Sequence, residues 1–293
     1  MRSYFEKRPH LVYVMPAMLI LGLLTFIPTI FLYALSMTNY ELGYPDFQFV
    51  GLDNFVRLFT GGDPEFWHSA YISVAFMIIV TTIEMLLGFW LATLLDREFR
   101  LKPIVFACLI VPIAMTPSIA GQIWKLMLNA EYGVINYMLS RFGGKVIWLS
   151  AENAFLSTVL VDVWQNTPFV ALILYAGMRS LPSDPYEAAA IDGASRTQAF
   201  RLITLPLLLP IILLALIFRA IDSLKTFDIP YSLTQGGPGS ATEFLSLHVY
   251  RLGFAQTGWI GRSAAVSVIL LLLITVISML LIRAYRKGVQ QKG

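Results

Sequence analysis

The chain has 293 residues, of which 57% are hydrophobic and 13% charged, and its formal net charge is only +3. Soluble domains carry about a quarter charged residues, so this composition excludes an ordinary soluble protein and indicates a chain surrounded largely by lipid. A single cysteine excludes an internal disulfide, and the separated histidines His10, His68 and His248 lack the spacing of a metal site. No block of Lys and Arg resembles a nucleic-acid-binding surface, so neither metal nor nucleic acid is expected as a ligand.

Six stretches are long and apolar enough to cross a membrane, because a spanning helix needs about 20 mostly apolar residues. Backbone groups in hydrocarbon must be hydrogen-bonded within the segment, so each stretch is predicted to be a helix. Pro112 and Pro117 are expected to bend the third one. An all-α integral membrane protein follows, with a single membrane domain over residues 1–293. The predicted spans cover residues 11–36, 70–95, 103–126, 155–178, 207–229 and 263–283.

The basic residues of the connecting segments predict the orientation of these spans. Thirteen Lys and Arg residues lie in the segments on one side of the membrane and five lie on the other. Because cytoplasmic segments carry the excess of Lys and Arg, both termini and the loop of residues 179–206 are predicted to be cytoplasmic. On the outer side, turns are expected at residues 60–64 and 236–239, and a short amphipathic helix is expected between Gly133 and Phe142.

The longest cytoplasmic loop contains the local signals of a helix, a turn and a second helix. Asp184 is expected to cap the first helix, and Glu187 is placed to complete a capping box. Gly193 suits the left-handed position that ends such a helix. Ser195 followed by Gln198 is a second capping-box pattern. The loop is therefore predicted to project from the membrane as a rigid helical knob.

The same loop resembles the EAA loop of ATP-binding-cassette import permeases. Glu187-Ala188-Ala189 is followed by Gly193 four positions beyond Ala189, then by nine residues to Ile203, and then by Leu205-Pro206. Three further segments resemble the carbohydrate-uptake branch of this family, the maltose and glycerol-phosphate type. These segments are Trp164-Gln165-Asn166-Thr167-Pro168, Phe218-Arg219 through Phe227-Asp228, and Leu233-Thr234-Gln235-Gly236-Gly237-Pro238.

The resemblance implies a type I importer permease fold in the cytoplasmic membrane of a bacterium or archaeon, and it implies the partners. In this family the EAA loop seats in a groove of a cytoplasmic ATPase, so the coupling residues are expected to be Glu187, Ala188, Ala189, Asp192 and Gly193. The chain lacks a phosphate-binding loop, so ATP and its magnesium ion are expected on partner subunits and no cofactor is expected on this chain. The implied partners are a second permease, two ATPases and an external solute-binding protein.

The solute path is expected to lie near the middle of the fourth and fifth spans. Transporter sites tend to lie at the bilayer midplane, where polar residues are otherwise rare. In related sugar permeases the solute is held between these two helices, and the fifth is predicted to present its polar residues on one face. By this resemblance the solute-binding residues are Gln165, Asn166, Phe169, Arg219, Ser223 and Thr226.

Arg219 has two alternative roles. It could form an ion pair with Glu84, near the middle of the second span, which would leave a pore suited to a neutral sugar. This alternative is favoured. If Arg219 instead faces the pore, with Lys225 above it, a sugar bearing a carboxylate, phosphate or sulfonate becomes the natural counter-ion. Asp162 is expected to be a structural or vestibule residue.

Other functions remain open from the sequence alone. Within the importers, the solute could be an amino acid, a polyamine or a phosphate ester instead of a sugar. An intramembrane transferase would need clustered acids that hold Mg²⁺, and Asp184, Glu187 and Asp192 are the candidates. No second acidic cluster faces them from another cytoplasmic loop, which argues against this enzyme. A membrane anchor without transport activity is disfavoured by the polar midplane of the fourth span.

Overall fold

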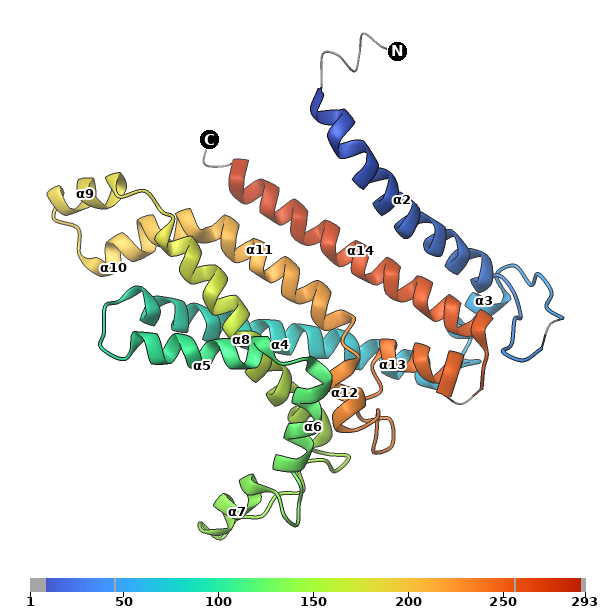
Figure 1. Cartoon of the computed structure of the whole chain (residues 1–293). Helices are drawn as coiled ribbons and strands as arrows, with labels where there is room; N and C mark the ends of the chain where they lie inside the picture. The colour runs from blue at the N-terminus through green and yellow to red at the C-terminus, as the bar shows by residue number, and fades with distance from the viewer. Residues whose placement is uncertain (1–8, 45, 256, 291–293) are drawn as a thin grey trace. The chain divides into compact units, whose positions relative to one another are not determined.

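The computed structural model describes residues 9–44, 46–255 and 257–290 (Figure 1). Within these ranges the structure is helical and has no β-strand. Five helices are long and apolar enough to span a membrane, and a sixth span results when one sharply bent helix pair is counted as one. The predicted all-α membrane architecture is therefore confirmed. Four of the basic residues used to predict the orientation lie outside the described residues, namely Arg2, Lys7, Arg8 and Lys292.

One compact unit comprises Met1–Pro64 and Val249–Ile269. A close contact within it involves Gly261, in the first turn of α14. The Gly261 N–H donates to the Tyr40 carbonyl at 3.0 Å, and a Cβ added to Gly261 would lie 2.0 Å from the Thr38 carbonyl oxygen. Only glycine therefore fits where α14 begins. The helices of this unit are α2 (Pro9–Ser36), α3 (Asp53–Phe59), the π-helical turn η2 (Arg251–Ala255) and the first part of α14 (Ile260–Gln290).

The second unit comprises Glu65–His248 and Leu270–Gly293, and it contains the remaining helices together with the rest of α14. The short outer helix expected between Gly133 and Phe142 is present as α7. The helices of this unit are α4 (Pro64–Asp96), α5 (Lys102–Ala114), α6 (Pro117–Met127), α7 (Val134–Ser140), α8 (Ala154–Arg179), α9 (Asp184–Ile191), α10 (Arg196–Ala199), the π-helical turn η1 (Phe200–Thr204), α11 (Leu205–Leu224), α12 (Asp228–Leu233) and most of α13 (Leu245–Tyr250).

Glycines allow the long helices of the second unit to approach closely. A Cβ added to Gly88 on α4 would lie 2.6 Å from Val170 Cγ1 on α8. A Cβ added to Gly177 on α8 would lie 2.7 Å from Ile211 Cδ1 on α11. Small residues serve this purpose in membranes, where van der Waals packing holds helices together. The resulting contacts hold α8 between α4 and α11.

The predicted third span is divided into two helices. α5 ends at Ala114, Met115 and Thr116 are extended, and α6 begins at Pro117 with a bend of 104° (Figure 1). The residue before a proline is disfavoured in the helical region, and a proline fits well at the first position of a helix. The predicted bend is confirmed, but the prediction of one continuous helix over residues 103–126 is wrong.

The fifth span ends earlier than predicted, because α11 stops at Leu224 and not at residue 229. Pro230 prevents a single helix from continuing into α12. In a continuous helix its ring would clash with the Thr226 carbonyl, and it has no N–H to donate to that oxygen. The Thr226 carbonyl instead accepts a hydrogen bond from the Ser246 hydroxyl.

Candidate functional site

The EAA loop forms an exposed helical knob, as its sequence predicts. None of the residues of α9 is buried. Gly193 follows the helix with a φ of +72°, which confirms the predicted left-handed position. The Ala194 N–H donates to the Ala189 carbonyl at 2.9 Å, and the Gly193 N–H donates to the Ala190 carbonyl at 3.2 Å. These two hydrogen bonds are those of a Schellman motif, so the end of α9 is held by backbone geometry.

The two predicted caps of the loop have different outcomes. The capping box at α10 is confirmed, because the Ser195 N–H donates to Gln198 Oε1 at 2.7 Å and the Gln198 N–H donates to Ser195 Oγ at 3.3 Å. The cap predicted at Asp184 is wrong. Asp184 is the first residue of α9, Ser183 precedes the helix, and no side chain caps it. The first turn is closed instead by the Glu187 N–H, which donates to the Ser183 carbonyl at 3.1 Å.

The predicted coupling residues lie together at the surface of this knob. Glu187, Ala188, Asp192 and Gly193 are exposed, and Ala189 is half-buried. Sequence reasoning missed Ile191, a large apolar side chain that is 87% exposed at the end of α9. An isoleucine directly before the Asp-Gly pair that ends the helix is the signal that could have revealed it.

A side-chain hydrogen bond ties the knob to the base of α11. The Tyr186 and Thr204 hydroxyl oxygens are 2.9 Å apart. Thr204 is the last residue of η1, which joins α10 to α11 in one helical run over Arg196–Leu224. This contact links α9 to the start of the helical run that contains α11.

A cavity of about 370 Å³ lies at the other end of α11, within the second unit. It opens beside the break between α5 and α6, and α8 and α11 supply most of its polar groups. Four of the six residues predicted to bind solute line it together. The principal lining residues are Ile113, Met115, Pro117, Gln165, Asn166, Phe169, Phe218, Arg219, Asp222 and Lys225.

Gln165 is held by the break between α5 and α6. Its Nε2 donates to the Met115 carbonyl at 3.0 Å, and the residue is only 5% exposed. This carbonyl is available because α5 has ended and no following turn donates to it. Gln165 Oε1 has no hydrogen-bond partner among the described residues. The side chain therefore has a fixed amide and one unused acceptor.

Ser223 and Thr226 lie outside the wall of this cavity. Ser223 is buried, and its hydroxyl donates to the Arg219 carbonyl at 2.8 Å. Thr226 lies beyond the end of α11, so the predicted helix face of Arg219, Ser223 and Thr226 does not reach it.

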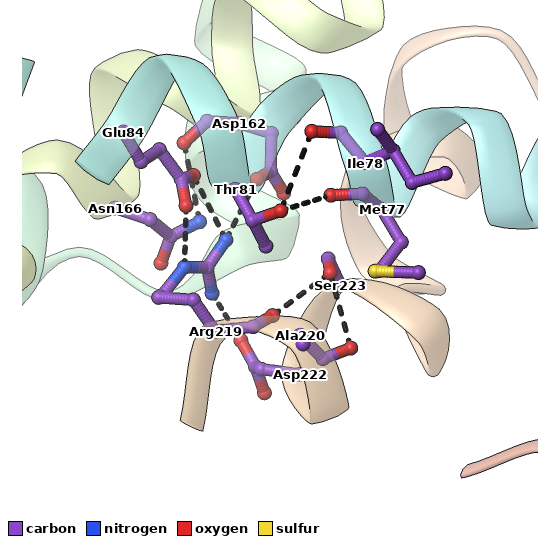
Figure 2. A network of polar contacts seen from close by, with 10 residues as sticks. All are labelled: Met77, Ile78, Thr81, Glu84, Asp162, Asn166, Arg219, Ala220, Asp222 and Ser223. Carbon is purple, nitrogen blue, oxygen red and sulfur yellow. Dashed lines mark hydrogen bonds and ion pairs between the residues drawn. The ribbon is translucent and has the colours of Figure 1, made fainter. Parts of the chain in front are cut away.

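Arg219 is the centre of a buried ionic network (Figure 2). Its Nε donates to Glu84 Oε2 at 2.7 Å, and its Nη2 donates to Glu84 Oε1 at 2.9 Å. Nη2 also donates to Asp162 Oδ1 at 2.9 Å, and Nη1 donates to Asp222 Oδ2 at 2.7 Å. The side chains of Glu84, Asp162 and Arg219 are at most 4% exposed. The structure thus contains the ion pair considered for Glu84 and Arg219, and it adds two further carboxylates.

Sequence reasoning missed these two carboxylates as partners of Arg219. The signal for Asp222 was its spacing of three residues on the same helix. The signal for Asp162 was its place inside an apolar span, where an ionisable residue needs a partner. With three acidic side chains around one guanidinium, the network is larger than the single pair that the sequence suggested.

A second polar cluster lies near the start of α4. Among the described residues, Glu65, Glu243 and His248 form a group whose potential ligand atoms all lie within 4.8 Å of one another. His248 Nδ1 lies 3.2 Å from Glu243 Oε1, and both residues are buried. The sequence predicted no carboxylate frame around this histidine, because the frame comes from distant segments. The three residues are spaced to hold a metal ion, but the buried histidine and glutamate are also within hydrogen-bond distance of each other.

The relatives of this chain with curated names include several transport system permease proteins. Residues 84–291 match the sequence profile of the family described as "Binding-protein-dependent transport system inner membrane component". The trehalose/maltose transport system permease protein MalF of Thermococcus litoralis is 36% identical, over 93% of this chain and 92% of that protein. The sulfoquinovosyl glycerol transport system permease protein SmoG of Agrobacterium fabrum is 35% identical, over 92% and 88%. The sn-glycerol-3-phosphate transport system permease protein UgpA of the same organism is 34% identical, over 83% and 82%.

A solved structure shares the fold. A chain of the bacterial alginate ABC transporter, in complex with an alginate pentasaccharide-bound periplasmic protein, aligns with a TM-score of 0.81. The alignment covers 96% of each chain at 23% identity. This likeness shows the type I importer permease fold expected from the EAA loop.

Proposed function

Because the chain belongs to the family of binding-protein-dependent transport system inner membrane components, we propose that it is the sugar-translocating subunit of an ATP-driven importer. It is a multi-pass protein of the cytoplasmic membrane and a transporter subunit, not an enzyme. Its relatives are named for trehalose/maltose, sulfoquinovosyl glycerol and sn-glycerol-3-phosphate, which are sugars or polyol derivatives. The proposed solute is therefore a sugar or a sugar derivative.

The observation that carries this proposal is the exposed EAA knob and its link to α11. In the proposed complex, α9 seats in a groove of a cytoplasmic ATPase subunit. Small Ala188 allows close approach, exposed Ile191 supplies apolar contact, and Glu187 and Asp192 face a basic rim. Two such ATPase subunits bind ATP and its magnesium ion, and this chain binds neither.

Movement of the knob reaches the cavity through α11. The Tyr186–Thr204 hydrogen bond lies at one end of this helical run, and Arg219, Asp222 and Lys225 lie at the other. In the proposed mechanism, ATP hydrolysis shifts α9 and changes which side of the membrane the cavity faces. A second permease subunit completes the pore, and an external solute-binding protein delivers the sugar.

Gly193→Val tests the coupling role. A β-branched residue at a φ of +72° is strained by about 1–2 kcal/mol, so the Schellman turn should open and the knob should be displaced. We expect sugar uptake and solute-stimulated ATP hydrolysis by the complete transporter to fall about five- to thirtyfold, since a strain of about 1–2 kcal/mol corresponds to that factor in equilibrium. Insertion of the chain into the membrane should be normal.

Gly143→Val is the matched control. Gly143 also has a positive φ, +76°, and a Cβ at either glycine would meet nothing within 4 Å. Gly143 follows α7, away from the knob, so this variant should retain stimulated hydrolysis. If Gly193→Val and Glu187→Lys both keep wild-type stimulation, α9 does not couple this chain to an ATPase.

The proposed orientation places both termini in the cytoplasm. A reporter fused after Lys292 should be active as a cytoplasmic reporter, whereas reporters inserted at residues 60–64 or 236–239 should be external, because Lys and Arg favour the cytoplasmic side. Activity of paired phosphatase and fluorescent-protein fusions measures this directly. An external location for the EAA loop would contradict both the orientation and the coupling role.

A further inference from the structure

Two charged side chains in the cavity wall are open to it, whereas a third is buried. The side chains of Asp222 and Lys225 are 56% and 58% exposed, compared with 3% for Arg219. Asp222 Oδ1 lies 3.5 Å from Lys225 Nζ at the end of α11. The cavity therefore meets a carboxylate and an ammonium group side by side.

Arg219 is not available to a solute. All three guanidinium nitrogens already donate to carboxylates, of which Glu84 and Asp162 are buried. A solute that captured the guanidinium would leave a buried carboxylate without its cation, and such an uncompensated charge is strongly unfavourable. This arrangement removes Arg219 from the candidates for direct solute contact.

We propose that Asp222 and Lys225 recognise two neighbouring hydroxyl groups of an uncharged sugar, and that Arg219 is a positioning residue that orients Asp222. This inference rests on the proposed importer function and names the solute class of the same cavity. A hydroxyl group both donates and accepts. One hydroxyl donates to Asp222 Oδ1 while its neighbour accepts from Lys225 Nζ, so a vicinal diol fits the pair.

The buried network orients Asp222 before a solute arrives. Arg219 Nη1 holds Asp222 Oδ2 at 2.7 Å, which leaves Oδ1 as the acceptor for a hydroxyl. Arg219 is in turn fixed by Glu84 and Asp162 through the contacts of Figure 2. Charge-assisted hydrogen bonds are short and directional, so the carboxylate loses little freedom when a sugar binds.

The charges of the cavity wall suit an uncharged solute. Asp222 and Lys225 are its two exposed charged groups and pair with each other, and the Arg219 guanidinium is occupied by its carboxylate partners. A carboxylate, phosphate or sulfonate on the solute would compete with Asp222 for Lys225 and would meet the Asp222 carboxylate as a like charge. An uncharged polyol meets no such penalty.

The remaining walls suit the rest of a sugar ring. Phe169 and Phe218 provide apolar surface beside the exposed polar groups of the wall. An apolar cavity with a few fixed polar groups is typical of small-molecule sites. A sugar ring offers carbon-bound hydrogens to the phenylalanines.

Uptake by the complete transporter in proteoliposomes tests the proposal. The probes are maltose, trehalose and glycerol 3-phosphate, and the variants are Asp222→Asn, Lys225→Gln and Lys225→Arg. For the neutral sugar that the wild type imports, Asp222→Asn and Lys225→Gln should each raise KM at least about tenfold, because a hydrogen bond to a charged group is lost. Lys225→Arg keeps a cationic donor, so KM should change less than about threefold. This is a smaller change than the loss of one hydrogen bond to a charged group would cause.

A second measurement, competition between solutes, separates a change in solute recognition from a general loss of transporter stability. With one carboxylate removed, Asp222→Asn should make glycerol 3-phosphate a better competitor of neutral-sugar uptake, whereas a merely destabilised transporter would lose all solutes alike. Asp96→Asn, at the exposed end of α4, is the matched control and should behave as the wild type.

Three outcomes would overturn the inference. An unchanged neutral-sugar KM in Asp222→Asn would exclude Asp222 as the acceptor. A wild-type transporter that imports glycerol 3-phosphate but neither neutral sugar would exclude selection against anions. Absence of any ATP-dependent uptake by the wild type would instead remove the proposed importer function, and this inference with it.

Discussion

Arg219→Gln is expected to prevent this chain from assembling into a stable transporter. The substitution removes the only guanidinium that contacts the buried carboxylates of Glu84 and Asp162 among the described residues. Removing one partner of a buried ion pair costs about 3–5 kcal/mol, because the remaining charge is left without compensation. Fluorescence-detected size-exclusion chromatography in detergent should show loss of the monodisperse peak and a lower thermal midpoint.

The structure predicts that rescue is graded. Arg219→Gln with Glu84→Gln still leaves Asp162 buried without its cation, so this double variant should recover little. Adding Asp162→Asn removes the last fully buried carboxylate of the network. The triple variant should recover much of the stability, because the stability effects of substitutions within one network are not additive. It should still fail to transport, since Asp222 has lost the residue that orients it.

Arg57→Gln is the matched control for this series. Arg57 also forms an ion pair, with Asp53 at 3.1 Å, but both side chains are more than half exposed. Such surface pairs contribute about 0–1 kcal/mol, so the thermal midpoint should hardly move. If Arg219→Gln is as mild as this control, the network does not hold α4, α8 and α11 together.

Gly88→Ala is expected to have the next largest effect. The added Cβ would lie 2.6 Å from Val170 Cγ1 and 3.1 Å from the Ala171 backbone nitrogen. A branched side chain and a backbone atom cannot move away easily, so α4 and α8 must separate. Overpacking of this kind costs about 1–3 kcal/mol, and here it also displaces Glu84 on the preceding turn of α4. The thermal midpoint and the sugar uptake should both fall.

Two further variants make this prediction specific. Gly22→Ala on α2 adds the same methyl group, but its nearest neighbour is Phe26 Cδ2 at 3.9 Å, so stability should be unchanged or slightly higher. Val170→Ala in the Gly88→Ala background removes the closest methyl groups and should restore part of the lost stability. Equal midpoints for Gly88→Ala and Gly22→Ala would show that α4 and α8 are not closely packed.

Local chemistry in the sequence determined the spans and the coupling knob. A backbone in hydrocarbon must form its hydrogen bonds within each segment, so an apolar run of sufficient length predicts a helix without reference to the rest of the chain. Gly193, Ser195 and Gln198 act on their immediate neighbours, and their predicted roles are found in the structure. The same local rule failed at Asp184, where a backbone hydrogen bond from Glu187 closes the first turn.

Only the tertiary structure decided which groups surround Arg219 and what the cavity can bind. Glu84 and Asp162 are 135 and 57 residues away from Arg219 in the sequence, and no local pattern states which acids the packing of α4, α8 and α11 brings together. The same holds for Gln165, whose amide is fixed by the Met115 carbonyl 50 residues away. Side-chain partners across helices depend on helix rotation and bending, and a span predicted from hydropathy fixes neither.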